Sequence, residues 1–347
     1  MKILLLMDPY IPVPPVHYGG IERIVHDLAN QYVKMGHEVT LVAGPNSVSP
    51  GRLIIYGENG PISPRLNFKN IRQVYKILKA EIHNHDVIHN FGRLAYLLPF
   101  LRMDIPKVQS YLRHVTIKNI RIVDWLGPKN LIYTAVSNVI RDMGQTGNSK
   151  WQTVYNCTPV NEFTFRSQTK PDGYLAFIGR FERCKGLHNA IEVAKATQRE
   201  LVIAGFVSDI PHEQQYFENE IKPQIDGKTI KWIGTVNNEE RNQLLGKASA
   251  LITPVEWSEP FPLILPEAYA CGTPVLGFNR GGIAEGIDHG YTGYLSNTVA
   301  EMVADVNRLS ELKRIDCRKK AVNSYSGEKI AADYINVYKS LFAPTAG

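Results

Sequence analysis

The sequence predicts an α/β protein of two domains, each built on a parallel β-sheet that helices cover. Three observations lead to this prediction. The chain has 347 residues, which is enough for two domains of ordinary size. Short apolar runs typical of buried strands alternate with segments of helical periodicity through both halves. Residues 161–172 lack strong periodicity and contain a proline, so we predict the linker there.

The first three elements form a βαβ unit. Residues 2–7 are predicted to be a buried strand, and a proline-rich loop follows. Gly19 and Gly20 then open a helix to about residue 35, and residues 39–43 form the next strand. The backbone N–H groups at this glycine pair suit a phosphate group, although a tight glycine turn explains the pair equally well.

The alternation of strands and helices continues to the C-terminus. Further strands are expected at residues 86–89, 108–112, 133–136, 174–179, 201–205, 230–233, 250–253 and 275–278. Further helices are expected at residues 68–82, 138–143, 213–222, 239–246 and 329–342, with others beginning at 187 and 299.

Charge is shared unevenly between the two halves. Residues 1–168 hold 19 Lys and Arg against 11 Asp and Glu, a net charge of +8. Residues 169–347 hold 20 against 22, a net charge of −2. A basic first half favours an anionic partner such as acidic lipid headgroups, with ordinary solubility charge as the open alternative. The amphipathic segment 113–125 leaves the same two alternatives open. No nucleic-acid-binding motif is present.

Composition points to a cytoplasmic protein, at the inner face of the membrane if the basic half binds lipid. The longest near-continuous apolar run has eight residues, Leu94–Leu101, whereas a membrane-spanning helix needs about 20. The four cysteines are scattered and form no C-x-x-C pair, which is typical of a reduced compartment.

Three polar residues are predicted to lie at the carboxyl ends of first-domain strands, where ligand clefts open in parallel sheets. These residues are His89, Arg113 and His114, and each is also explained as an ordinary polar residue at the rim of the sheet. His83 and His85 lie close to His89 in sequence, but no set of acids accompanies them, so we predict no metal site.

The most informative stretch is residues 257–275, WSEPFPLILPEAYACGTPV. Proline is tolerated in the first turn of a helix, so Pro266 places the start of a helix near Leu263. Glu259 then lies on the preceding loop and Glu267 in or just past the first turn. Two carboxylates beside free helix N–H groups suit a ligand with an anionic end and several hydroxyls. A helix start that merely carries acids is the alternative.

A second polar segment, GRFERCKG at residues 179–186, joins a strand to a helix. Arg180 and Lys185 flank this junction, and two cations beside a helix N-terminus can clamp a diphosphate.

Both segments resemble motifs of the retaining glycosyltransferases of the GT-B fold, the large family-four group. Residues 179–186 match the G-R-x4-K-G pattern in full. The E-x7-E motif is matched by Glu259, Phe261, Glu267, Ala268, Ala270, Gly272, Pro274 and Val275. Pro262 replaces the usual glycine. The resemblance spans residues 2 to about 295 and is weakest in 45–135.

This resemblance implies two Rossmann-like domains that face each other across a cleft. The acceptor-side domain would be residues 1–168, and the nucleotide-sugar-binding domain would be residues 169–327. Residues 328–347 would form a helix that returns to the first domain. The activity implied is transfer of a sugar from a UDP- or GDP-sugar to a glycan or lipid-linked acceptor, with retention of anomeric configuration. We expect no metal cofactor, because the two cations of residues 179–186 make a metal unnecessary and the sequence has no convincing D-x-D metal motif.

The resemblance also implies roles for particular residues. Arg180, Lys185 and the amide of Gly20 would bind the donor diphosphate. Glu267 would bind the ribose, and Glu259 the hydroxyls of the sugar. Amides of Phe261 and Leu263 would contribute, whereas Pro262 has no N–H to donate. Either Arg113 or His114 would face the donor sugar, where the family often has a histidine.

Two other functions remain open at this stage. A non-hydrolysing sugar-nucleotide epimerase would need acid and base groups beside the sugar. A non-catalytic regulator would bind a nucleotide-sugar without transferring it. The combined acidic and cationic motifs favour the transferase.

Overall fold

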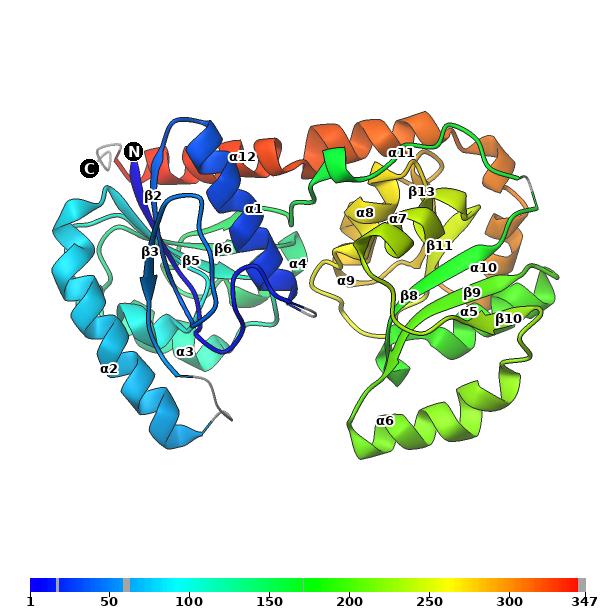
Figure 1. Cartoon of the computed structure of the whole chain (residues 1–347), viewed down its shortest axis with the longest axis horizontal. Coiled ribbons are helices and arrows are strands. Elements are labelled where there is room, and N and C mark those ends of the chain that lie inside the picture. Colours follow the sequence, from blue (N-terminus) through cyan, green and yellow to red (C-terminus); the bar gives the residue numbers. More distant parts are fainter. Residues whose placement is uncertain (17–18, 59–62, 171, 343–347) are drawn as a thin grey trace. The chain divides into compact units, whose positions relative to one another are not determined.

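The computed structural model describes residues 1–16, 19–58, 63–170 and 172–342 (Figure 1). Contacts divide the chain into two compact units. The first unit is Met1–Cys157 together with Gly327–Gly347, and the second unit is Thr158–Ser326.

The first unit contains a seven-stranded sheet in which all paired strands are parallel. The strand order is β3-β2-β1-β4-β5-β6-β7. The strands are β1 (Lys2–Leu6), β2 (Glu38–Ala43), β3 (Arg52–Ile55), β4 (Val87–Asn90), β5 (Lys107–Tyr111), β6 (Leu131–Ala135) and β7 (Trp151–Thr153). The strand order runs outward in opposite directions from β1 and from β4, so the topological switch point lies between these two strands. Ligands bind beside the carboxyl ends of strands at such a point.

Within the described residues of this unit, five α-helices and two 3-10 helices accompany the sheet. They are α1 (Gly20–Lys34), α2 (Pro64–Glu81), α3 (Ile117–Trp125), α4 (Asn138–Gly144), α12 (Gly327–Ser340), η1 (Ile82–Asn84) and η2 (Leu94–Phe100). Helix α2 begins four residues before the predicted start, because the Ser63 hydroxyl caps the amide of Leu66 and Pro64 occupies the first turn.

The last helix, α12, completes the first unit. The hydroxyls of Tyr32 on α1 and Tyr338 on α12 lie 2.9 Å apart, and both side chains are buried. This is the helix that we expected to return to the first domain, and its bounds are two residues earlier than predicted at each end. Of the predicted 328–347 segment, residues 343–347 lie outside the described residues.

The second unit contains a six-stranded parallel sheet of order β10-β9-β8-β11-β12-β13. Its strands are β8 (Leu175–Phe181), β9 (Leu201–Val207), β10 (Ile230–Trp232), β11 (Ala250–Thr253), β12 (Val275–Phe278) and β13 (Gly293–Ser296). Its switch point lies between β8 and β11. Both units are therefore Rossmann-like, as the sequence predicts.

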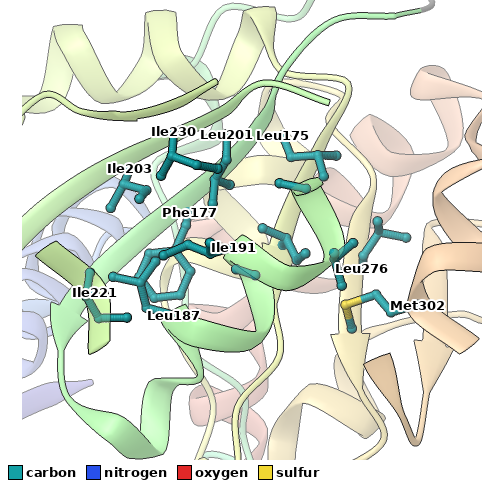
Figure 2. Close-up of a cluster of buried hydrophobic side chains, with 14 of the residues drawn as sticks. Leu175, Phe177, Leu187, Ile191, Leu201, Ile203, Ile221, Ile230, Leu276 and Met302 are labelled. Carbon is teal, nitrogen blue, oxygen red and sulfur yellow. The ribbon is translucent and has the colours of Figure 1, made fainter. Parts of the chain in front are cut away.

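Helices surround the second sheet. The α-helices are α5 (Leu187–Ala196), α6 (Pro211–Tyr216), α7 (Asn238–Lys247), α8 (Ile264–Ala270), α9 (Gly281–Gly286), α10 (Val299–Val306) and α11 (Arg314–Lys320). Shorter helical turns are η3 (Val160–Glu162), η4 (Arg183–Lys185), η5 (Phe217–Ile221), η6 (Lys222–Gln224), η7 (Leu309–Glu311) and η8 (Ala321–Tyr325). Figure 2 shows the core on one face of this sheet, where Phe177 of β8 lies close to Leu187 and Ile191 of α5.

The boundary between the units differs from the predicted one. The sequence suggests a boundary at residue 168, whereas the contacts place it between Cys157 and Thr158. The intervening segment belongs to the second unit because it bonds to that unit's helices. The amide of Arg166 donates to the carbonyl of Cys271 at 3.1 Å, and Arg318 donates to the carbonyls of Val160 and Phe163. Residue 171 of the predicted linker lies outside the described residues.

Two strands of the first sheet are absent from the prediction. They are the edge strands β3 and β7, which have only four and three residues and are mostly half-exposed. A short edge strand leaves no continuous apolar run for a sequence pattern to detect.

Candidate active site

The predicted diphosphate segment lies at the switch point of the second sheet. Arg180 and Lys185 flank the strand-to-helix junction, as predicted. The strand β8 extends to Phe181 and so includes Arg180, and η4 follows with Lys185 as its last residue. Gly186 then adopts a φ of +73° at the start of α5. A Cβ at this position would lie 1.9 Å from the carbonyl oxygen of Pro254, so only glycine fits. The loops after β8 and β11 are therefore held in backbone contact.

Lys185 and Glu259 form an ion pair across these two loops. The Nζ of Lys185 lies 2.5 Å from Oε2 of Glu259, and their side chains are 19% and 10% exposed. The indole N–H of Trp257 donates to the same oxygen at 2.6 Å, and its ring centroid lies 5.0 Å from Nζ. The two residues that the resemblance assigns to the diphosphate and the sugar are thus direct neighbours, which the sequence did not indicate.

The backbone of Glu259 is held by the start of α9. The amide of Gly282 donates to the carbonyl of Glu259 at 2.7 Å. A Cβ on Gly281 would lie 2.5 Å from that carbonyl oxygen, and one on Gly282 would lie 2.1 Å from the carbonyl oxygen of Pro260. Both glycines are therefore needed for this close approach, which orients the Glu259 loop.

Glu267 lies in the first turn of α8, where the sequence predicted it. Its carboxylate lies 3.1 Å from Nε of Arg241 on α7, and the side chains are 5% and 14% exposed. Sequence reasoning missed Arg241, because no local pattern connects it with a residue 26 positions away. The structure therefore has a second acid–cation pair in which the acid is one of the predicted donor-site residues.

The remaining donor-side candidates are Arg180, Phe261, Pro262 and Leu263. Arg180 lies 3.1 Å from Oε1 of Glu182 and has a side chain that is 40% exposed. Phe261 is buried, and its ring centroid lies 5.4 Å from that of Tyr325. Pro262 and Leu263 are partly buried, and their carbonyls accept bonds from residues of α8.

The other candidate residues belong to the first unit. Gly20 is the first residue of α1, directly after the cap residue Gly19. Arg113 and His114 are exposed, and Arg113 lies 3.9 Å from Asp8. His89 does not lie at a rim as expected, because its two ring nitrogens are 2.6 Å from the hydroxyls of Tyr338 and Ser110. Its full burial lowers its pKa well below the ordinary value, so it is a neutral core residue.

A polar cluster around Asp8 occupies the switch point of the first sheet and was also missed. Asp8 follows β1, accepts a hydrogen bond from Tyr96 at 2.7 Å and lies 3.5 Å from Nε of Arg93. Burial is the main cause that raises the pKa of the neighbouring Glu22, and the charge of Asp8 adds to it. The signal available in the sequence was the position of Asp8 at the end of the first strand.

Two families of proteins have models that match adjacent parts of this chain. The Glycosyltransferase Family 4 model matches residues 18–161, and the model named Glycosyl transferases group 1 matches residues 161–324. The chain belongs to the family-four glycosyltransferases. It is therefore an enzyme that transfers a sugar.

Relatives and solved structures of this glycosyltransferase cover nearly the whole chain. A phosphatidyl-myo-inositol mannosyltransferase of Propionibacterium freudenreichii is 24% identical over 372 residues, which cover 95% of this chain and 90% of that protein. Sucrose-phosphate synthase from Thermosynechococcus elongatus aligns over 99% of this chain and 100% of its own, with a TM-score of 0.77 and 20% identity. HepE of Anabaena in complex with UDP-glucose aligns over 98% and 100%, with a TM-score of 0.71 and 18% identity. The fold of this glycosyltransferase is thus GT-B.

The described parts of this glycosyltransferase contain neither a metal-binding cluster nor a membrane-spanning helix. Within residues 1–16, 19–58, 63–170 and 172–342, no group of three or more His, Cys, Asp or Glu is placed to hold a metal ion. Over the same ranges, none of the helices combines the length and apolar character needed to span a bilayer.

Proposed function

We propose that this glycosyltransferase moves a sugar from a UDP- or GDP-sugar to a glycan or lipid-linked acceptor, with retention of anomeric configuration. The bond between the anomeric carbon and the diphosphate oxygen breaks, and the acceptor hydroxyl oxygen bonds to that carbon. The hydroxyl proton leaves on the departing diphosphate. The E-x7-E motif, typical of the retaining group, supports this stereochemistry.

The observation that carries the proposal is the Lys185–Glu259 pair. An ammonium group has three N–H donors, and a carboxylate has two oxygens. Lys185 can therefore donate to a phosphate oxygen while it still bonds to Oε2 of Glu259, and Oε1 can accept from a sugar hydroxyl. The pair thus suits a ligand in which a diphosphate adjoins a polyhydroxylated ring.

Charge development explains why such a site accelerates transfer. Negative charge grows on the diphosphate as the glycosidic bond breaks, and preorganised cations stabilise that charge more in the transition state than in the substrate. Lys185 is held in place by Glu259 and Trp257, so little reorganisation is needed. Arg180 on β8 supplies a second cation, and no metal cofactor is required in this scheme.

The other donor contacts follow from chemistry and position. Glu267 would accept hydrogen bonds from ribose hydroxyls, with Arg241 holding its carboxylate. The first unit would bind the acceptor near Asp8 and Arg93. We place the enzyme in the cytoplasm, since its four cysteines are free thiols, three of them buried.

The test combines binding and turnover. Thermal stabilisation by UDP, GDP and their sugars identifies the base, since a ligand that binds the folded state raises its stability by about 2.7 kcal/mol at 100 times its Kd. Lys185→Met should lower turnover by about 100-fold or more, as expected for the loss of one preorganised donor. Lys228→Met is the matched control, because Lys228 is exposed before β10, at the opposite end of the second sheet.

Three results would contradict the proposal. One is a folded enzyme that no nucleotide stabilises. Another is an epimerised donor formed without any acceptor, which would indicate an isomerase. The third is donor binding without transfer to any glycan or lipid-linked acceptor. The anomeric proton coupling in the product, measured by NMR, distinguishes retention from inversion.

A further inference from the structure

We infer that the first unit docks on an anionic lipid surface through the outer face of helices α2 and α3. This inference goes beyond the proposed transfer reaction and does not depend on the identity of the donor. It rests on the charge of α2, on exposed large apolar side chains on both helices and on the place of both helices in the fold.

Helix α2 carries a basic stripe directed away from the sheet. Val74 and Leu78 are fully buried and mark the inner face of the helix. At 100° per residue, the opposite face carries five exposed cations. They are Arg65, Lys69, Arg72, Lys76 and Lys79.

Acids are missing from this stripe. Residues 64–80 contain no Asp or Glu, and the acid at the end of α2, Glu81, is buried. Among the cations of the stripe, Lys69 pairs with Glu58 from the loop before the helix. By contrast, α12 alternates acids with lysines, as in its Lys329–Asp333 pair. A face that serves only for solubility usually mixes both signs, as α12 does.

Large apolar side chains are exposed beside these cations. Phe68 on α2 is 63% exposed, and the guanidinium of Arg72 lies 6.0 Å from its ring centroid. Trp125 at the end of α3 is 83% exposed, and Ile122 is 46% exposed. Trp125 and Ile122 line a shallow hollow together with Ile117, Lys118 and Arg121. Trp and Phe next to Lys and Arg are the side chains that favour the interface of a bilayer.

The two helices lie on the same side of the first sheet. Crossovers between parallel strands are right-handed, and α2 and α3 both connect strands in the β1-to-β7 direction. Helix α1 connects strands in the opposite direction and covers the other side. Figure 1 shows this arrangement within the first unit. Both helices therefore present their outward faces on the same side of the first sheet.

The apolar residues favour a bilayer over nucleic acid as the partner. Phosphate contacts and base stacking on aromatic rings would explain the cations, Trp125 and Phe68, but not the exposed aliphatic side chains of Ile117 and Ile122. A membrane that contains anionic lipid attracts the cations and accepts the apolar side chains at its interface. If the acceptor is lipid-linked, which rests on the proposed function, the same contact would bring the enzyme to it.

The experiment is sedimentation of the full chain with phosphatidylcholine vesicles, with and without phosphatidylglycerol. We expect binding only with phosphatidylglycerol and release at high salt. The double variant Arg72→Glu/Lys76→Glu should lower the partition coefficient by about 20-fold or more, because each cation contributes about fivefold. The matched control is Lys170→Glu/Lys228→Glu, which changes total charge equally at exposed lysines of the second unit.

Trp125 tests the apolar part. Trp125→Ser should lower vesicle binding several-fold without changing binding to heparin or RNA. We expect the tryptophan fluorescence of the wild type to shift to shorter wavelength on vesicle binding. Trp125→Phe should keep vesicle binding and lose that shift. Equal binding to neutral vesicles, equal loss in both double variants, or RNA binding without vesicle binding would overturn the inference. Nucleotide-induced thermal stabilisation of Arg72→Glu/Lys76→Glu should equal that of the wild type, which separates this test from that of the donor site.

Discussion

The Nε of Arg241 lies 3.1 Å from a carboxylate oxygen of Glu267, and the two side chains are 14% and 5% exposed. The pair joins α7 to the first turn of α8. A carboxylate held by one cation keeps a fixed orientation and retains an oxygen for another donor. We therefore treat Arg241 as a positioning residue for the proposed ribose contact of Glu267.

Breaking this pair from one side should destabilise the second unit. Arg241→Met leaves the buried carboxylate of Glu267 without its cation, which costs about 3–5 kcal/mol. The double variant Arg241→Met/Glu267→Leu should recover much of that loss, because no uncompensated charge remains. Chemical denaturation measures both. Donor affinity should also fall in Arg241→Met. If the free energy of unfolding of Arg241→Met lies within about 0.5 kcal/mol of the wild-type value, the pair is not a structural unit.

The absence of a side chain at Gly281, and not only its backbone conformation, should be required for use of the donor. A Cβ in Gly281→Ala would lie 2.5 Å from the carbonyl oxygen of Glu259 and displace that loop. We expect kcat/KM for the donor to fall by about tenfold or more, since small misplacements in a site have large effects.

Gly290 provides the control for Gly281. Its φ is +77°, and nothing lies within 4 Å of a Cβ placed there. Gly290→Ala therefore has a similar backbone cost of about 1 kcal/mol and no contact with the site. If both alanine variants lower donor kinetics equally, the contact between α9 and the Glu259 loop has no role in positioning.

Arg314 should be among the most sensitive positions of the second unit. It is buried and donates to the carbonyls of Gly246, in the last turn of α7, and Ala248, the C-cap of α7, both at 2.9 Å. It also donates to the carbonyl of Arg166 at 2.7 Å. Arg314→Met removes the donor from several buried acceptors, each worth about 1–3 kcal/mol.

The control for Arg314 is an arginine near the surface. Arg308 is 46% exposed and pairs with Glu311 at 3.1 Å. Arg308→Met should change the free energy of unfolding by less than about 1 kcal/mol. Denaturation followed by two probes should show the second unit unfolding earlier in Arg314→Met, and equal effects of the two substitutions would argue against the structural role.

Acid should destabilise the first unit through His89. Burial lowers the pKa of His89 in the folded state, while the unfolded chain has the ordinary pKa of about 6.5. The folded state therefore binds fewer protons, so its full stability is present above pH 6.5 and is lost as the pH falls. The loss should approach about 1.4 kcal/mol per pH unit.

The measurement is the free energy of unfolding of the first unit between pH 4.5 and 7. His89→Gln should lower the acid slope by one proton, whereas His83→Gln should leave it unchanged, because His83 is exposed. An unchanged slope in His89→Gln would mean that another group accounts for the acid sensitivity.

The sequence alone determined the fold class and the donor-side motifs. Buried strands such as β1 and amphipathic helices such as α1 can be recognised from local patterns, because the positions of the apolar residues within one segment show which of its faces is buried. Pro266 placed the start of a helix near Leu263, with Glu259 before it and Glu267 in or just past its first turn, and the structure has this arrangement.

Only the tertiary structure decided which distant residues meet. The Lys185–Glu259 and Arg241–Glu267 pairs join residues on separate strand–helix units, and no local pattern records their contact. His89 has the sequence position of a rim residue, but packing against Tyr338 makes it part of the core. The boundary at Cys157 was likewise set by hydrogen bonds that Arg318 donates to the carbonyls of Val160 and Phe163 and that the amide of Arg166 donates to Cys271. Such contacts arise when separate elements pack, and that packing is not encoded in the periodicity of any one segment.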